Sequence, residues 1–175
     1  TGPVIGYMAT GGHGSDLDLV LPAIEQLLKE MPGLRFATFG TIPPPERLAR
    51  FEARVAPFKG IPDYSAFHER LHDLGWWVAI APLEDTPFNR CKADTKWVEY
   101  AFSGVPAVVS DLPVYHKACA DGAGALAADT EQWLKALRTM LIDHRARQAT
   151  LAQARQRLID LYGRDRLSRQ VNAIF

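Results

Sequence analysis

Short apolar segments alternate with longer amphipathic segments along most of the chain. The apolar segments are nearly continuous and too short for helices, which is typical of strands buried on both faces. The amphipathic segments repeat their apolar positions every three to four residues, as helices do. We expect strands at residues 3–9, 34–39, 55–58, 77–81 and 107–109, with a further short one at 124–126. Helices are expected at residues 17–31, 46–54, 64–74, 95–103, 130–143 and 145–162.

This alternation predicts one α/β domain over residues 1–175, with a Rossmann-like, doubly wound parallel sheet of about six strands and helices on both faces. Such a sheet binds ligands beyond the carboxyl ends of its strands, near the switch in strand order. We therefore expect the loops after the first, third and fourth strands to meet at one edge and form one site.

The segment 92–110 carries the most specific signal. Asp94 is expected to cap a helix by accepting a bond from a first-turn amide, and Gly104 and Pro106 to end it. Glu99 is an acid within this mostly apolar helix, where a carboxylate is costly unless it meets a ligand or a partner. We interpret Glu99 as a ribose-binding carboxylate at the edge of a nucleotide site.

A glycine-rich loop follows the first strand. Its residues are Thr10, Gly11, Gly12, His13, Gly14, Ser15 and Asp16. Glycines before a helix let backbone amides approach a phosphate, and His13 can donate to a phosphate or a sugar hydroxyl. The alternative is a plain tight turn capped by Ser15 or Asp16. The loop does not match a dinucleotide fingerprint, because Leu17 stands where the third glycine belongs.

Two further groups of residues are candidates for chemistry. Lys92 and Lys96 flank the start of the 95–103 helix, and we favour Lys92 as a diphosphate contact. His68 and His72 form an H-E-x-x-H pattern, which predicts zinc when a third ligand is present. A zinc hydrolase with Glu99 as a distant third ligand is therefore an alternative, although we expect both histidines to lie on the flank of their helix.

Composition narrows the class of protein. The formal net charge is zero, so no overall field favours nucleic acid, and we expect no nucleic-acid partner. Two cysteines, Cys91 and Cys119, make no disulfide framework, which favours a cytoplasmic compartment. Residues 138–169 hold eight arginines against three acids. We interpret them as a solvated helix face, with a peripheral position at the inner membrane face or a lipid-linked acceptor as the alternative.

Several of these segments resemble the C-terminal half of GT-B fold glycosyltransferases, especially the large retaining group 1 family. Residues 99–110, Glu-Tyr-Ala-Phe-Ser-Gly-Val-Pro-Ala-Val-Val-Ser, resemble its E-A-x-A-x-G-x-P-V-V-x-S motif. Residues 58–60 resemble its F-x-G, and residues 77–82 its apolar strand ending in proline. Residues 125–145 resemble its closing segment, through Trp133, Leu137, Leu141, Asp143 and Arg145.

The resemblance implies the donor-binding domain of a larger two-domain enzyme whose N-terminal acceptor-binding domain is absent. It implies transfer of a hexosyl group from a UDP- or GDP-sugar to an acceptor with retention, in polysaccharide biosynthesis, without a metal or other cofactor. By resemblance, Glu99 binds the ribose. The expected base contacts are Gly60, Ile61 and Tyr64. The expected phosphate and sugar contacts are Gly11, Gly12, His13, Gly14, Ser15, Asn89 and Lys92.

Two positions depart from the family pattern. Cys91 stands eight residues before Glu99, where the family often has a second glutamate for the donor sugar. The family's Arg/Lys pair for the diphosphate, near the first helix, is also missing, and we expect Lys92 to substitute for it by charge. These departures leave a non-catalytic, glycosyltransferase-like binding domain as a further alternative.

Overall fold

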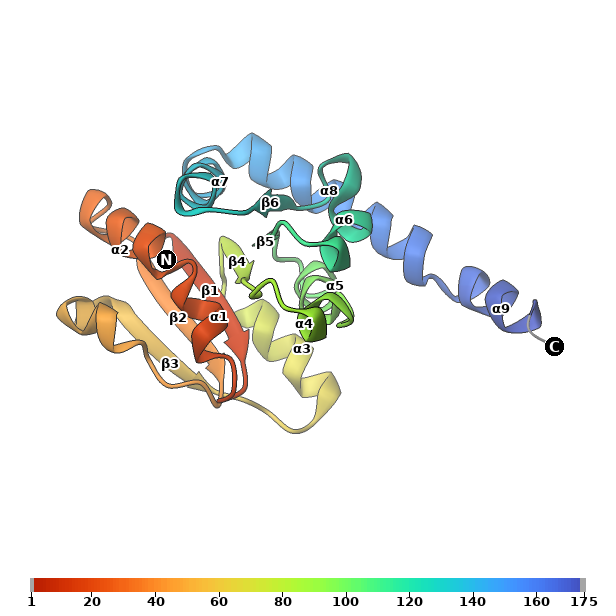
Figure 1. Cartoon of the computed structure of the whole chain (residues 1–175), viewed down its shortest axis with the longest axis horizontal. Coiled ribbons are helices and arrows are strands. Elements are labelled where there is room, and N and C mark those ends of the chain that lie inside the picture. Colours follow the sequence, from red (N-terminus) through yellow and green to blue (C-terminus); the bar gives the residue numbers. More distant parts are fainter. Residues whose placement is uncertain (1, 174–175) are drawn as a thin grey trace.

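The structure, a computed structural model, describes residues 2–173, and within them six strands form one parallel sheet (Figure 1). The strands are β1 (Val4–Ala9), β2 (Arg35–Gly40), β3 (Val55–Lys59), β4 (Val78–Ala81), β5 (Ala107–Ser110) and β6 (Ala125–Ala127). Their order is β3-β2-β1-β4-β5-β6, and every neighbouring pair is parallel. This confirms the expected fold class. The switch in strand order lies between β1 and β4, where a ligand site is expected.

Helices cover both faces of the sheet. They are α1 (Gly14–Asp18), α2 (Leu21–Glu30), α3 (Tyr64–Asp73), α4 (Pro87–Arg90), α5 (Thr95–Phe102), α6 (Pro113–Cys119), α7 (Thr130–Ile142), α8 (His144–Tyr162) and α9 (Arg164–Asn172), with 3₁₀ segments η1 (Glu46–Arg54) and η2 (Ala120–Gly122). One core packs α2 and α7 on the sheet, and a second packs α3, α5, α6 and α8 on the opposite face. Helix α9 lies beyond the end of α8, away from the sheet (Figure 1).

The prediction of one continuous helix over residues 17–31 is wrong. The chain forms α1 and then α2, with Val20 as the N-cap of α2 and Pro22 in its first turn. Proline has no amide hydrogen and its ring clashes with the carbonyl four residues earlier, so a helix can start at Pro22 but not run through it. The stretch 46–54 forms a kinked 3₁₀ segment, and α4, α6 and α9 were not expected from the sequence.

Helix α5 ends as predicted but begins differently. Gly104 has a φ of 77°, the left-handed conformation expected after the last turn, and Pro106 precedes β5. Asp94 is the N-cap residue, but its carboxylate accepts no bond from the first-turn amides. It accepts instead from the Tyr162 hydroxyl, at 2.6 and 2.7 Å to its two oxygens. The start of α5 is therefore attached to the end of α8.

Tyr100 attaches the middle of α5 to the sheet. Its buried hydroxyl accepts from the Met8 amide at 3.0 Å and donates to the Ile80 carbonyl at 3.0 Å. It thereby bridges β1 and β4 just beyond their last paired residues, Tyr7 and Ile80. Glu99 precedes Tyr100 in the chain, so its position is set by this bridge. No helix among residues 2–173 is both long and apolar enough to cross a bilayer.

Candidate functional site

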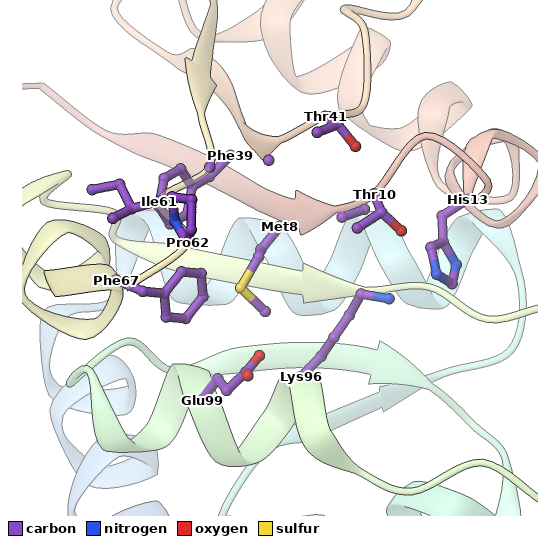
Figure 2. Close-up of a pocket in the computed structure, with 13 residues that line it drawn as sticks. Met8, Thr10, His13, Phe39, Thr41, Ile61, Pro62, Phe67, Lys96 and Glu99 are labelled. Atoms are coloured by element: carbon purple, nitrogen blue, oxygen red, sulfur yellow. The ribbon is translucent and has the colours of Figure 1, made fainter. Parts of the chain in front are cut away.

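A cavity of about 470 Å³ lies at the carboxyl ends of the first three strands, beside α5 (Figure 2). Its lining residues are Met8, Ala9, Thr10, His13, Phe39, Gly40, Thr41, Gly60, Ile61, Pro62, Phe67, Lys96 and Glu99. It is thus built from the loops after β1, β2 and β3 together with one helix. Of the three loops expected to form one site, those after β1 and β3 line this cavity, and the loop after β2 is an unexpected member. The loop after β4 contributes none of its lining residues.

Two glycine backbones form part of the cavity wall. Gly40, at the end of β2, has a φ of 130°, and a Cβ there would overlap the Ala9 carbonyl oxygen. Gly60 follows β3, and its amide donates to the Gly40 carbonyl at 3.3 Å. A Cβ on Gly60 would lie 3.2 Å from the Gly40 Cα, which is tight. The three strand ends therefore approach closely only because side chains are absent at both positions.

Glu99 projects from α5 into this cavity, and it is half-buried. Burial raises the pKa of its carboxyl, and the charge of Lys96 partly offsets that effect. Lys96 lies one helical turn before Glu99 on the same face of α5 and lines the same cavity. Neither residue forms an ion pair with another side chain among residues 2–173. Both charges are thus available to a ligand.

His13 is held in the cavity wall by a buried acid. Its Nδ1 lies 2.8 Å from Oδ2 of Asp16, which is only 4% exposed. The other carboxylate oxygen of Asp16 accepts from the Glu84 amide at 2.8 Å, and this contact joins the loop after β1 to the loop after β4. The contacts leave Nε2 of His13 as the ring nitrogen available to a ligand.

A second cavity of about 490 Å³ adjoins the first, and the two share His13 and Lys96. Its other lining residues are Gly12, Leu83, Phe88, Lys92, Ala93, Thr95 and Tyr115. The loops after β1 and β4 therefore meet here, as expected. Lys92 lines only this second cavity, with its ammonium 5.2 Å from the centre of the Phe88 ring.

Several of the expected site residues line neither cavity. The Gly11 amide donates to Thr41 Oγ1 at 3.0 Å, and Gly14 starts α1. The Ser15 hydroxyl donates to a Glu84 carboxylate oxygen at 3.1 Å. Asn89 is buried, and its side-chain amide donates to the Glu84 carbonyl at 2.9 Å. These four residues shape the two loops.

Tyr64 and Cys91 also lie outside both cavities. Tyr64 is 66% exposed and its ring stacks on Phe67, which is the aromatic residue of α3 that does line the first cavity. Cys91 is exposed at the end of α4. The expected site residues therefore belong to loops at this edge of the sheet, but not all of their side chains face the cavities.

The histidines of the H-E-x-x-H pattern belong to another surface. Nδ1 of His68 lies 3.0 Å from the Ser103 hydroxyl, and Nδ1 of His72 lies 3.0 Å from the Ser103 carbonyl. Both line a pocket between α3 and α5 that does not include Glu99. No group of three or more metal-ligating side chains is gathered anywhere in residues 2–173. The zinc alternative therefore lacks its third ligand.

The first cavity has two chemically different ends (Figure 2). Phe39, Ile61 and Phe67 gather at one end, and His13 and Lys96 at the other, with Glu99 between them. An apolar, aromatic end suits a flat ring system, and the cationic end suits an anion. A carboxylate between them suits hydroxyl donors. The sequence pattern K-x-x-E in α5 was the signal that could have identified Lys96, because residues three apart share one face of a helix.

Comparison with solved structures identifies the fold of the chain, whereas comparison of sequences finds no relative. No protein-family profile matches the sequence. No curated protein sequence is significantly similar to it. Among solved structures, HepE from Anabaena in complex with UDP and glucose superposes with a TM-score of 0.77 at 14% identity, over 99% of this chain and 48% of that one. A variant of TarM from S. aureus, in complex with fondaparinux, alpha-GlcNAc-glycerol and UDP, gives 0.73 at 14% identity, over 98% and 35%.

The C-terminal domain of LpcC, a group 1 family glycosyl transferase from Francisella tularensis, gives a TM-score of 0.64 at 12% identity, over 91% of this chain and 86% of that one. The chain thus spans about a third to a half of TarM and HepE and most of the isolated LpcC domain. At these identities the likeness establishes the fold: the chain has the architecture of the C-terminal domain of a GT-B glycosyltransferase.

Proposed function

We propose that this chain is the nucleotide-sugar-binding domain of a glycosyltransferase that transfers a hexosyl group from an NDP-sugar to an acceptor. The observation that carries the proposal is Glu99: a half-buried carboxylate without an ion pair to any of residues 2–173, between an aromatic and a cationic end of one cavity. The fold shared with UDP-bound HepE and TarM supports it. The acceptor site then belongs to an N-terminal domain, as the shares of those chains suggest.

In the proposed complex, the base lies against Phe39, Ile61 and Phe67, beside the backbone of Gly60. The two ribose hydroxyls donate to Glu99, and the diphosphate extends toward His13 and the second cavity, which takes the sugar. During transfer the acceptor oxygen bonds to the anomeric carbon, on the face that the diphosphate leaves, as the bond from that carbon to the diphosphate oxygen breaks. The nucleoside diphosphate leaves with the bonding electrons and takes up the proton of the acceptor hydroxyl. Positive groups beside the diphosphate lower the barrier, because they stabilise the charge that develops on it. We propose retention at the anomeric carbon from the family resemblance.

The test is a thermodynamic cycle between Glu99 and the ribose hydroxyls. Binding of UDP, GDP and 2′,3′-dideoxy-UDP is measured by calorimetry for the wild type and for Glu99→Gln. Hydrogen bonds to a charged group contribute about 1.5–3 kcal/mol, so Glu99→Gln is expected to weaken UDP binding by roughly 10- to 150-fold. It should barely change the affinity for the dideoxy compound, which has no ribose hydroxyl to donate to the carboxylate.

A matched control is Glu131→Gln, which removes an exposed glutamate in the first turn of α7 and should change neither affinity. Equal losses for UDP and the dideoxy compound would refute the ribose role of Glu99. Failure of every nucleoside diphosphate to bind at millimolar concentration would refute the proposed function itself. Turnover of a UDP- or GDP-sugar by the enzyme with its N-terminal domain separates an active transferase from a binding domain.

A further inference from the structure

The ammonium group of Lys96 lies within the site, 5.8 Å from the centre of the Tyr7 ring. Lys96 is half-buried, lines both cavities, and forms no ion pair with any of residues 2–173. Figure 2 shows its side chain running along the cavity with the nitrogen toward His13. Burial lowers the pKa of this ammonium, and Asp16 and Glu99 offset only part of that effect. A partly desolvated charge raises the free energy of the unliganded protein, and a bound anion stabilises it.

Lys92, which the sequence favoured as the diphosphate contact, is less well placed for that role than Lys96. It lines the second cavity only, and its ammonium lies over the Phe88 ring, whose side chain is 75% exposed. It therefore has no contact with the first cavity, where Glu99 lies. Lys96 lies at the junction itself, one helical turn from Glu99. A group bound next to the ribose reaches Lys96 before it reaches Lys92.

Asp16 orients the second polar group at the junction. Its carboxylate only accepts, so the His13 Nδ1 at 2.8 Å carries the shared hydrogen. The same carboxylate is fixed by the Glu84 amide at 2.8 Å, and its burial keeps water from competing. With Nδ1 held by Asp16, Nε2 is the ring nitrogen that faces a bound phosphate. Asp16 is therefore a positioning residue that acts through His13.

We propose that Lys96 is the principal cation for the donor diphosphate, and that His13, oriented by Asp16, is its second contact. The inference rests on the proposed function and deepens it. It assigns to α5 the charge that the resembled family supplies from near the first helix. One helix face then carries both the ribose contact and the phosphate contact. Binding then needs no divalent cation, because these two groups supply the contacts to the diphosphate.

The experiment compares uridine, UMP and UDP, and the guanosine series, by calorimetry in the presence of EDTA. For the base that binds, wild-type affinity should rise strongly from nucleoside to diphosphate. Lys96→Met should lower the ratio of diphosphate to nucleoside affinity by roughly tenfold to a hundredfold and leave nucleoside binding unchanged. Lys92→Met should lower the ratio less than threefold. Lys29→Met, which removes an exposed lysine paired with Glu25 on α2, should not change it.

The role of Asp16 has its own readout. The imidazole ¹⁵N resonances of His13 should shift when UDP is added but not when uridine is added. In Asp16→Asn, checked for folding by circular dichroism, this response should be lost and the ratio should fall severalfold. His13→Gln, which leaves Asp16 in place, should lower the ratio similarly if Asp16→Asn fails to fold.

The outcomes separate the two proposals. If UDP or GDP binds and Lys96→Met keeps the wild-type ratio while Lys92→Met loses it, the assignment of the phosphate cation is overturned and the nucleotide function stands. A ratio that collapses when EDTA removes divalent ions would overturn it as well. If no nucleotide of either series binds to the wild type, both proposals fail together.

Discussion

Replacement of Gly40 by alanine is the most demanding test of the cavity architecture. The residue has a φ of 130°, a conformation that costs a side-chain-bearing residue about 1–3 kcal/mol. The new Cβ would overlap the Ala9 carbonyl oxygen and lie 3.0 Å from its carbon. That oxygen accepts from the Thr41 amide at 3.1 Å, and displacing it forfeits a bond worth about 0.5–1.5 kcal/mol.

These contributions give an expected loss of about 2–4 kcal/mol in the free energy of unfolding for Gly40→Ala. For a domain of this size the melting temperature should fall by roughly 4–16 °C. Urea denaturation with an unchanged m-value would show that native stability, not the compactness of the unfolded chain, has changed. UDP affinity should also fall, because Ala9, Gly40 and Thr41 line the cavity.

The matched control is Gly33→Ala. A Cβ at Gly33 meets nothing within 4 Å, and the backbone there has no positive φ. This variant should be neutral or gain up to about 1 kcal/mol, because alanine restricts the unfolded chain more than glycine does. If Gly40→Ala loses less than about 1 kcal/mol, the strand ends are not held together as described, and the argument for the cavity wall is refuted.

Two further predictions concern pH and the attachment of α5. UDP affinity should be highest at intermediate pH. It should fall in acid as Glu99, whose pKa is raised by burial above 4.5, loses its charge. It should fall in alkali as Lys96 loses its proton, because burial and the charge of Lys92 lower its pKa below 10.5, and Asp16 and Glu99 offset only part of that effect. The alkaline fall in the ratio of UDP affinity to uridine affinity should disappear in Lys96→Met, and its persistence would contradict the assignment. Tyr162→Phe should cost about 1 kcal/mol by removing the bonds to Asp94, measured by urea denaturation, whereas Tyr64→Phe on the exposed α3 surface should cost nothing. Equal effects of the two would mean that α8 does not hold the start of α5.

The order of strands and helices was predictable because apolar runs and helical periodicity report burial directly. The end of α5 was equally predictable, since a glycine with a proline two residues later is a common signal for the end of a helix. Pro22 indicates that a helix begins there, but the apolar pattern continues across it without a break and predicts one longer helix. The start of α5 was not predictable, because the partner of Asp94 is Tyr162, 68 residues away.

The candidate site was only partly predictable for a different physical reason. Phe39 and Phe67 line the cavity, yet aromatic residues beside strands look the same in sequence whether they face a core or a ligand. Lys96 resembles any solvated helix lysine until the packing of α5 shows what surrounds it. Polar residues of the expected loops, such as Asn89 and Ser15, form hydrogen bonds with Glu84 in the loop after β4.

The Tyr100 hydroxyl between β1 and β4 has a consequence for how such a domain can diversify. It ties the neighbouring carboxylate to the sheet rather than to any loop, so the distance from Glu99 to the strand ends does not depend on loop length. Insertions or deletions between β4 and α5 can then reshape the second cavity while the first cavity keeps its dimensions. The adjacent residues Glu99 and Tyr100 thus separate a part of the molecule whose dimensions the sheet fixes from a part that loops can reshape.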